Sequence, residues 1–437
     1  MNVFKFIILW VSFYNPFIQG LLNLPPALEI VDEIVIVLYL IYLMLKKKNL
    51  YFKGAFVNYY LVLVLMFYLY NIFIVQQDLI KILYGSRFLA IPLILEIIII
   101  NMDTNYEELS KLFKFILNII LVHTIILFLQ GCYYFIIDHT LGDHVTGIVG
   151  GYSANVLGFL IAFQAIYYFL KYINGTNKLK SIFMICLSTI VILFCEAKAA
   201  FLCLILSAIV CFFKLKKDSM KNALLAIGIF AIVILISTQL LETIPQLSYL
   251  KNFNVIAAVE HEMVDYPKIG AAARITHFQY ANNILNQFAP NTLLGVGFST
   301  YESSGGNYFK APLAVMKMAF FTLITGKEVV THSQITTIMV EMGYLGLIML
   351  QLGFLICYFR LKYLQGNKII HDQIHFIKLA TIIVFLAQLS CNILEYQYFA
   401  CVYYILLFCT AAQSRICDND KLDKIYVPNM KVEVNSA

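Results

Sequence analysis

Four side chains of this sequence have the type and position needed to bind an anion or move a proton. Arg87 lies inside an apolar run, and Lys198 follows a turn between two apolar runs. Arg274 opens an amphipathic stretch, and His332 begins another long apolar run. The guanidinium fork of Arg87 suits phosphate oxygens, Lys198 could add a second contact, and a neutral imidazole can accept a proton. Anion binding and proton transfer are therefore the chemistries to test against the rest of the chain.

Each of these four residues also has a simpler interpretation. Arg87 could extend its charge to the membrane surface, Lys198 could be an exposed turn residue, and Arg274 could be a solvated loop charge. His332 is the most specific position. Thr331 is a plausible N-cap, so His332 would stand in the first helical turn, where the helix dipole disfavours the charged imidazolium. A histidine at a helix start can equally be a structural hydrogen-bonding residue.

Metal and disulfide chemistry have weak support. Two Asp-His pairs, Asp138-His139 and Asp143-His144, share one loop, but their spacing matches no strong metal-binding pattern. The 10 cysteines include no CxxC, and most stand inside apolar runs, which predicts small buried side chains and no disulfide framework. We predict no metal and no cofactor.

Composition indicates the elements that position these residues. Of 437 residues, 61% are hydrophobic and only 13% are charged, whereas soluble domains carry about 25% charged residues. The net charge of +6 lies in short clusters between apolar runs, which is typical of membrane topology and not of nucleic-acid binding. The sequence therefore predicts an all-α, polytopic transmembrane helix bundle.

About twelve spans of the length needed to cross the hydrocarbon layer are expected. Their approximate limits are 4–22, 29–45, 55–75, 80–100, 113–137, 153–170, 181–195, 198–213, 222–241, 333–358, 374–391 and 396–413. The first run has no clear cleavage site, so we interpret it as a retained span and not a signal peptide. Lys and Arg follow the even-numbered spans, which predicts that both termini are cytoplasmic.

One connection is too long for a simple bundle. The predicted organisation is a bundle of about nine spans over 1–241, a large extracytoplasmic loop over 242–331, about three spans over 332–413 and a cytoplasmic tail over 414–437. The loop should contain short helices, because residues 271–288 are amphipathic and residues 311–325 are apolar enough to lie in the interface or re-enter the bilayer. Loops of this length are usually functional.

The order of these segments resembles the family of bacterial O-antigen polymerases and O-antigen ligases. The resemblance covers the outline of about a dozen spans with one large external loop, and a motif string of about 80 residues. That string reads Ala273-Arg274-Ile275, Pro290 through Gly295-Val296-Gly297-Phe298, His332-Ser333 and Glu341-Met342-Gly343-Tyr344-Leu345-Gly346. Ser153-Ala154-Asn155-Val156-Leu157-Gly158 is also similar to the family. Where the family commonly has Ser-Arg-Gly, this chain has Ala197-Lys198-Ala199, which keeps a cation but loses the guanidinium fork.

The resemblance implies glycosyl transfer from a glycan linked through pyrophosphate to undecaprenol. It assigns Arg274 and Arg87, with Lys198 as a weaker third, to the pyrophosphate, and His332 to the acceptor hydroxyl as general base. Tyr280, Tyr301 and Tyr308 could stack on sugar faces, or could be ordinary surface aromatics. Glu341 would lie too deep for a direct role unless its helix is broken. The implied location is the bacterial inner membrane, with the lipid-linked oligosaccharide, the bilayer, a chain-length regulator and a flippase as partners, and no nucleic acid.

Three other functions stay open. A ligase would pass the polymer to lipid A core, whereas the polymerase, which we favour, passes it to another lipid-linked repeat unit. A flippase for the same lipids would show two related halves and charges spread over many spans. A non-catalytic scaffold would leave Arg274 and His332 without a role.

Overall fold

A computed structural model of the chain describes residues 2–14, 30–47, 50, 55–138, 141–149, 153–195, 197, 199–206, 228, 274–325, 333–361 and 368–426. Within these residues almost all regular structure is helical and no strand forms, apart from one isolated bridge between Asn291 and Gly295. The predicted all-α class is therefore confirmed.

The helices follow the apolar runs of the sequence closely. The first group is α1 (Asn2–Leu9), the π-helical η1 (Trp10–Tyr14), α3 (Val31–Lys46), α4 (Ala55–Phe73), α5 (Leu79–Gly85), α6 (Arg87–Asn101), α7 (Tyr106–Tyr133), η3 (Tyr134–Asp138), η4 (Gly142–His144), α8 (Ala154–Ile173) and α9 (Lys178–Phe194). The second group is α13 (Arg274–Phe288), α14 (Ser304–Tyr308), α15 (Pro312–Thr325), α16 (Gln334–Arg360), α17 (Lys368–Ala387) and α18 (Gln397–Tyr426). The described part of the predicted external loop thus consists of the three helices α13 to α15 and their connections.

Several helices are long and apolar enough to span a membrane, which indicates a membrane protein. Four helices meet this condition by length and composition, and α5 with α6 would make a fifth as one bent span. The predicted number of about twelve is not confirmed within the described residues, partly because Asn2–Tyr14 and Asn58–Phe73 are shorter apolar helices. Residues 222–241, the predicted ninth span, lie outside the described residues apart from residue 228.

Two details add to the prediction. The predicted span at 80–100 corresponds to α5 and α6, which meet at Ser86 with a bend of 67°. Helix α18 continues past residue 414, the predicted start of the tail, to Tyr426, so the first part of that predicted tail is helical. Residues 427–437 lie outside the described part of the chain.

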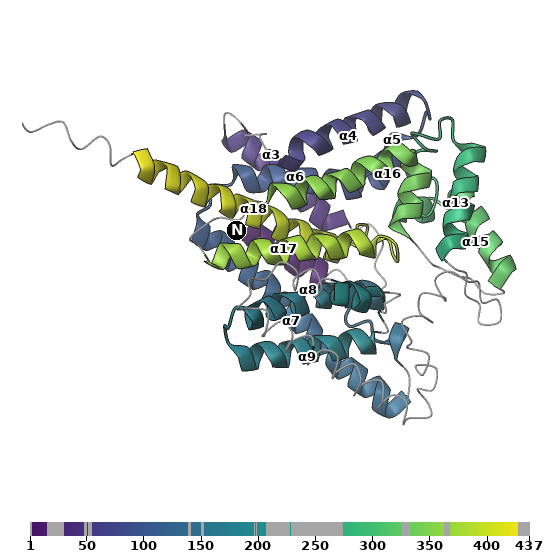
Figure 1. The fold of residues 1–437 in the computed structure, drawn as a ribbon. Coiled ribbons are helices and arrows are strands. Elements are labelled where there is room, and N and C mark those ends of the chain that lie inside the picture. Colours follow the sequence, from purple (N-terminus) through teal and green to yellow (C-terminus); the bar gives the residue numbers. More distant parts are fainter. Residues whose placement is uncertain are drawn as a thin grey trace, which may run out of the picture.

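Most of the long helices run side by side, and the segments from the predicted loop gather at one end of them. In Figure 1, α13 and α15 lie beyond the right-hand ends of α5 and α16, whereas the last turns of α18 extend from the opposite end. Helix α13 packs against α16, α16 against α4 and α17, and α8 against α9 and α17. The residues of the candidate site are therefore carried at the end of the bundle that α13 and α15 cover.

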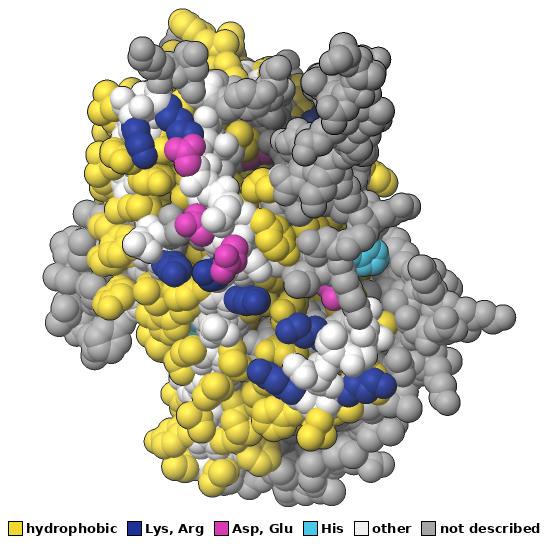
Figure 2. All heavy atoms as spheres, turned by 90° about the vertical axis from the view of Figure 1, so that its left-hand side faces the viewer, with side chains coloured by type: hydrophobic (Ala, Val, Ile, Leu, Met, Phe, Trp, Pro, Cys, Tyr) yellow, Lys and Arg dark blue, Asp and Glu magenta, His cyan; other side chains and the backbone are white. Residues whose placement is uncertain are grey.

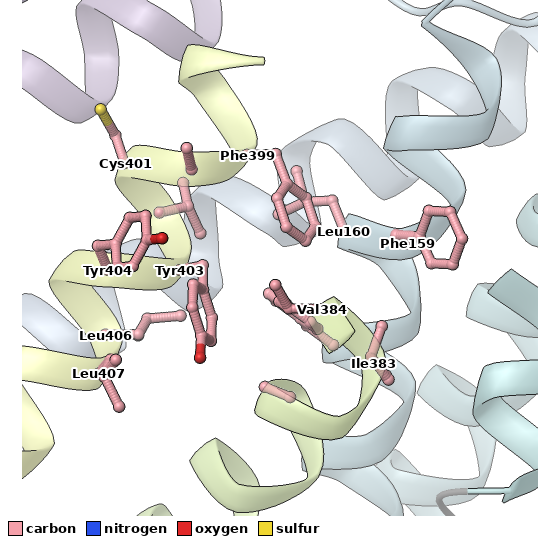
Figure 3. Packing of buried hydrophobic residues seen from close by; sticks show 14 of the residues in the cluster. Phe159, Leu160, Ile383, Val384, Phe399, Cys401, Tyr403, Tyr404, Leu406 and Leu407 are labelled. Atoms are coloured by element: carbon pink, nitrogen blue, oxygen red, sulfur yellow. The ribbon is translucent and has the colours of Figure 1, made fainter. Parts of the chain in front are cut away.

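Helix α18 forms the centre of the bundle. It contacts α1, η1, α6, α7, α8 and α17. Its residues from Tyr398 to Thr410 are all buried, with Tyr403 and Leu406 fully enclosed. Figure 3 shows this packing, in which Phe399 of α18 lies beside Leu160 of α8, and Val384 of α17 lies beside Tyr403 of α18. A helix that is buried on every side in this way fixes its neighbours relative to one another.

The end of the bundle opposite α13 and α15 carries many of the charges. Figure 2 shows Lys and Arg side chains gathered there, with a few Asp and Glu among them and apolar side chains around them. Lys47, which follows α3, forms a 2.6 Å salt bridge with Asp103, which follows α6. The hydrogen bond from Lys47 lowers the pKa of Asp103. The bundle therefore has two chemically different ends.

Candidate functional site

The central feature of the candidate site is a break in α16 at Gly343. Gly343 has φ 67° and ψ −174°, a backbone conformation that is essentially restricted to glycine. The break interrupts the helical hydrogen bonds around it and leaves backbone groups that need other partners. In an apolar helix such groups are tolerated only where the protein itself supplies those partners.

The loop at residues 291–297 supplies them. Val296 and Gly297 donate their N–H groups to the carbonyls of Val340 and Glu341, at 2.9 and 3.0 Å. In return, Tyr344 and Leu345 donate to the carbonyls of Thr292 and Leu293, at 3.3 and 3.0 Å. The Gly-x-Gly loop and the broken helix therefore complete each other's backbone hydrogen bonds.

Glycine is required on both sides of this contact. A Cβ atom on Gly295, which has φ 82°, would lie 2.5 Å from the backbone nitrogen of Gly343. A Cβ on Gly343 would lie 2.6 Å from the backbone nitrogen of Leu294. Both neighbours are backbone atoms that cannot rotate away, so the two glycines allow an approach that no other residue pair would.

Glu341 anchors the chain that follows this loop. Its fully buried carboxylate accepts hydrogen bonds from the N–H groups of Ser299 and Tyr301, at 3.0 and 2.9 Å, and from the Ser303 hydroxyl at 2.6 Å. The helix is indeed broken near Glu341, but all three contacts are to the protein's own loop. Glu341 therefore holds residues 299–303 against α16, so its observed role is structural.

A buried ion pair links the same loop to α15. The Lys317 ammonium pairs with the carboxylate of Glu302, and both side chains are almost completely buried. Glu302 also accepts a 2.6 Å hydrogen bond from the Thr336 hydroxyl of α16. The Lys317 nitrogen lies 5.8 Å from the centre of the Tyr301 ring. One carboxylate therefore ties the loop, α15 and α16 together.

Helices α13 and α15 enclose a groove of about 500 Å³. The described residues that line it carry no charge: they are Thr276, Gln279, Tyr280, Asn283, Ile284, Gln287, Met316, Ala319 and Phe320. Tyr280 stacks on Phe320 with ring centres 4.4 Å apart. Gln279, Asn283 and Gln287 recur every four residues, so they follow one face of α13. Amides beside aromatic rings suit an uncharged, hydroxyl-rich ligand.

Arg87 stands at the bend between α5 and α6, beside a second pocket. Its guanidinium forms a 3.2 Å salt bridge with Glu33 of α3, and both side chains are about 15% exposed (15% and 14%). The same guanidinium lies 3.8 Å from the centre of the Tyr84 ring, and Tyr84 in turn stacks on Tyr308 at 5.3 Å. An anion would therefore reach Arg87 only in competition with Glu33.

The three predicted tyrosines have different surroundings. Tyr308 is half exposed at the end of the Arg87–Tyr84 stack, and Tyr280 lies in the uncharged groove. Tyr301 is fully buried among Val296, Met339 and their neighbours, so stacking of a sugar on this ring is contradicted. Burial, with a smaller effect from Tyr280, raises the pKa of Tyr301, which keeps its phenol neutral.

The structure tests the predicted cations and base only in part. Arg274 is the first residue of α13, but its side chain lies outside the description, as do Lys198 and His332. Helix α16 begins at Gln334 with Ser333 as its N-cap, so the expected cap at Thr331 was wrong. His332 precedes the cap, and the argument from the helix dipole therefore applies to it less strongly. Of the predicted Asp-His pairs, residues 139 and 140 also lie outside the described residues.

Sequence reasoning missed the acidic partners in this region. Glu33 was not singled out although it pairs with Arg87, and neither were Glu302 or Glu395. Glu395 accepts a 2.6 Å hydrogen bond from the Ser304 hydroxyl. For Glu33 and Glu395 the available signal was their position at the ends of apolar runs, where an unpaired charge is costly. Comparison with known proteins adds no identity, since no protein-family model and no curated protein matches the chain.

Proposed function

We propose that this protein is a membrane-embedded glycosyltransferase that polymerises lipid-linked polysaccharide repeat units. The donor would be a glycan joined through pyrophosphate to undecaprenol, and the acceptor another lipid-linked repeat unit, as in O-antigen, capsule or exopolysaccharide synthesis. The proposal starts from the resemblance to O-antigen polymerases and ligases, and it is supported by how the motif segments meet in the fold.

One observation carries the proposal. Two separate segments of the motif string, around Gly295 and around Gly343, are joined by four reciprocal backbone hydrogen bonds. If the two segments were unrelated turns, nothing would require Gly295 and Gly343 to lie so close together. These two segments of the motif string therefore belong to one physical assembly, which the broken helix α16 and the loop at 291–303 build together.

The uncharged groove between α13 and α15 supports glycan as the ligand class. Sugars present hydroxyls that both donate and accept, which matches the amides of Gln279, Asn283 and Gln287. Tyr280 and Phe320 offer apolar ring surface next to them. The volume of about 500 Å³ is within the range of ordinary ligand pockets.

The proposed chemistry needs two functions from this end of the bundle. The acceptor hydroxyl attacks the anomeric carbon, the bond from that carbon to the pyrophosphate oxygen breaks, and lipid pyrophosphate leaves with the bonding electrons. Arg274 and Lys198 are the proposed contacts to the leaving group, because positive charge stabilises the negative charge that develops there. Arg87 would join them only by exchanging Glu33 for phosphate. His332 is the proposed acceptor of the hydroxyl proton.

The proposed orientation places α13 and α15 outside the bacterial inner membrane. The Lys- and Arg-bearing end in Figure 2 would then face the cytoplasm, in agreement with the positive-inside rule. Both termini would be cytoplasmic, and about twelve spans remain the proposed number. A chain-length regulator and a flippase of the same pathway are proposed partners.

Deletion of the gene followed by polysaccharide gel electrophoresis tests this function. A polymerase leaves a single repeat unit on lipid A core, whereas a ligase leaves polymer on undecaprenyl pyrophosphate. A flippase leaves the outer leaflet without lipid-linked units. An unchanged polysaccharide ladder in the deletion strain would exclude all three functions.

Complementation with variants tests the residues. His332→Ala should restore no long polymer, because no group would take the proton. Arg274→Lys should restore less than wild type, because lysine keeps the charge but loses the fork. Equal membrane levels of each variant are the control, and a normal ladder from Arg274→Ala would exclude its pyrophosphate role.

A further inference from the structure

Asp32 carries a buried carboxyl group without a hydrogen-bond partner in the described part of the chain. It lies in the first turn of α3, its exposed fraction is 0%, and neither carboxyl oxygen accepts a hydrogen bond from any described residue. Leaving a buried carboxyl unpaired is strongly unfavourable, and such groups in native proteins need an explanation. Its backbone neighbour Glu33 is, by contrast, fully engaged by Arg87 and Gln397.

Asp32 lines the pocket at the bend between α5 and α6. The polar groups around it come from four separate segments: Glu33, Arg87, the Ser303–Ser304 pair, and Glu395 with Gln397. Tyr84 and Tyr404 add aromatic surface. Ser303 also binds Glu341, so the loop on Gly343 forms one wall of this pocket. The pocket therefore adjoins the contact between the loop and α16 around Gly343.

The charges of the pocket define what it can bind. Arg87 is the single cation among the described lining residues, it is already paired with Glu33, and Asp32 and Glu395 add further acidic groups. Pyrophosphate would be repelled by such a lining. A metal ion is also a poor match, because the described residues contain no cluster of three His, Cys, Asp or Glu side chains arranged to hold one. Among the residues that the structure describes, none donates a hydrogen bond to the Asp32 carboxyl group.

We propose that this pocket receives a hydroxyl-bearing substituent of the acceptor glycan, and that the Asp32 carboxyl accepts its hydrogen bond. The inference rests on the proposed function for its ligand class. It also changes the expected role of Arg87, which would line the acceptor site and would not bind pyrophosphate. A cavity of about 30 Å³ admits a single hydroxyl or hydroxymethyl group and not a sugar ring. The rest of the sugar lies outside the pocket, where the half-exposed Tyr308 is available to contact it.

Binding measurements on the purified full-length protein in detergent test this site. The probes are the repeat-unit oligosaccharide released by mild acid from the host's own polysaccharide, and sodium pyrophosphate. Wild type is compared with Asp32→Leu, Asp32→Asn and, as a control at the opposite end of the bundle, Asp103→Asn. Dissociation constants and melting temperatures are recorded for each.

Asp32→Leu should bind the oligosaccharide about 10- to 100-fold more weakly, because it loses a hydrogen bond to a carboxyl group. Its melting temperature should be equal to or above that of wild type, because an unpaired buried carboxyl is replaced by an apolar side chain. Asp32→Asn keeps one acceptor oxygen, so its affinity for the oligosaccharide should fall several-fold. Asp103→Asn should bind as wild type does, and pyrophosphate binding should not depend on Asp32.

Three results would overturn the proposal: equal oligosaccharide affinity in Asp32→Leu, no oligosaccharide binding by wild type, or pyrophosphate binding that requires Asp32. If Asp32→Leu fails to fold, Asp32→Asn decides by the same criteria. The gene deletion separates this inference from the proposed function. If the deletion strain keeps its polysaccharide ladder but oligosaccharide binding depends on Asp32, the polymerase function is refuted and the Asp32 site is retained. If the ladder is lost but oligosaccharide binding does not depend on Asp32, the polymerase function is retained and the Asp32 site is refuted.

Discussion

Replacing Gly343 by alanine should disrupt the contact between the broken helix and the loop. The backbone there has φ 67° and ψ −174°, where an L-residue is strained by about 1–3 kcal/mol. The new methyl group would also lie 2.6 Å from the Leu294 nitrogen and overlap the Leu293 carbonyl group. The loop must therefore move away from α16.

The size of the effect follows from what the loop loses. Four backbone hydrogen bonds join the loop to α16 around Gly343, each contributing about 0.5–1.5 kcal/mol. Loss of two of them together with the strain amounts to about 4 kcal/mol. At roughly 2 °C for each kcal/mol in a large chain, the melting temperature should fall by about 8 °C.

The assay is thermal unfolding in detergent, followed by the fluorescence of Trp10, the only tryptophan in the chain. Gly175→Ala is the matched control. Gly175 has φ 75°, but a Cβ atom there would have no neighbour within 4 Å. It should therefore show the backbone strain alone, about 1 kcal/mol and roughly 2 °C. Equal shifts in the two variants would refute the claim that close approach to the loop is what requires glycine at position 343.

Three further predictions concern the surroundings of that contact. Lys317→Met should destabilise by about 3–5 kcal/mol, because Glu302 stays buried without its cation; adding Glu302→Gln should recover part of the loss in melting temperature, and a purely additive double variant would argue against a pair. Glu341→Gln should make residues 299–303 more sensitive to limited proteolysis. The amide N–H₂ of glutamine would replace one carboxylate oxygen and would then face a hydrogen-bond donor of the loop, which it cannot bind. Unchanged cleavage would contradict the anchoring role. Tyr280→Ala should weaken oligosaccharide binding about tenfold while Tyr280→Phe preserves it, and equal losses would point to the hydroxyl instead of the ring.

The positions of the helices could be predicted because each depends on local composition. The amphipathic stretch at 271–288 and the apolar stretch at 311–325 became α13 and α15 almost residue for residue. Hydrophobic periodicity and length are properties of a single segment, so no knowledge of its neighbours is needed.

The polar partnerships could not be predicted, because they join segments that are distant in sequence. The salt bridge between Arg87 and Glu33 spans 54 residues, and the Gln397 amide reaches the same carboxylate from 364 residues away. Treating Arg87 alone suggested an unpaired cation for phosphate. Its environment instead depends on the packing of α3 and α18 against α6, which a single sequence does not reveal.

The helix break at Gly343 could not be predicted from the sequence for a different reason. A glycine inside an apolar helix is usually tolerated at about 1 kcal/mol, so it gives no signal by itself. The break exists because the loop at 291–297 supplies alternative hydrogen bonds to α16. The local sequence permits both conformations, and the tertiary contact selects one of them.

The burial of α18 has a consequence for how this protein is made. Every other described helix precedes α18 in the chain, yet α1, α6, α7, α8 and α17 all pack onto it. Phe163 and Phe354 contact Phe399 and Tyr403 of α18, so both rings lack these partners until residues 397–413 have been synthesised and inserted. Completion of the bundle core therefore depends on the last helix of the described chain.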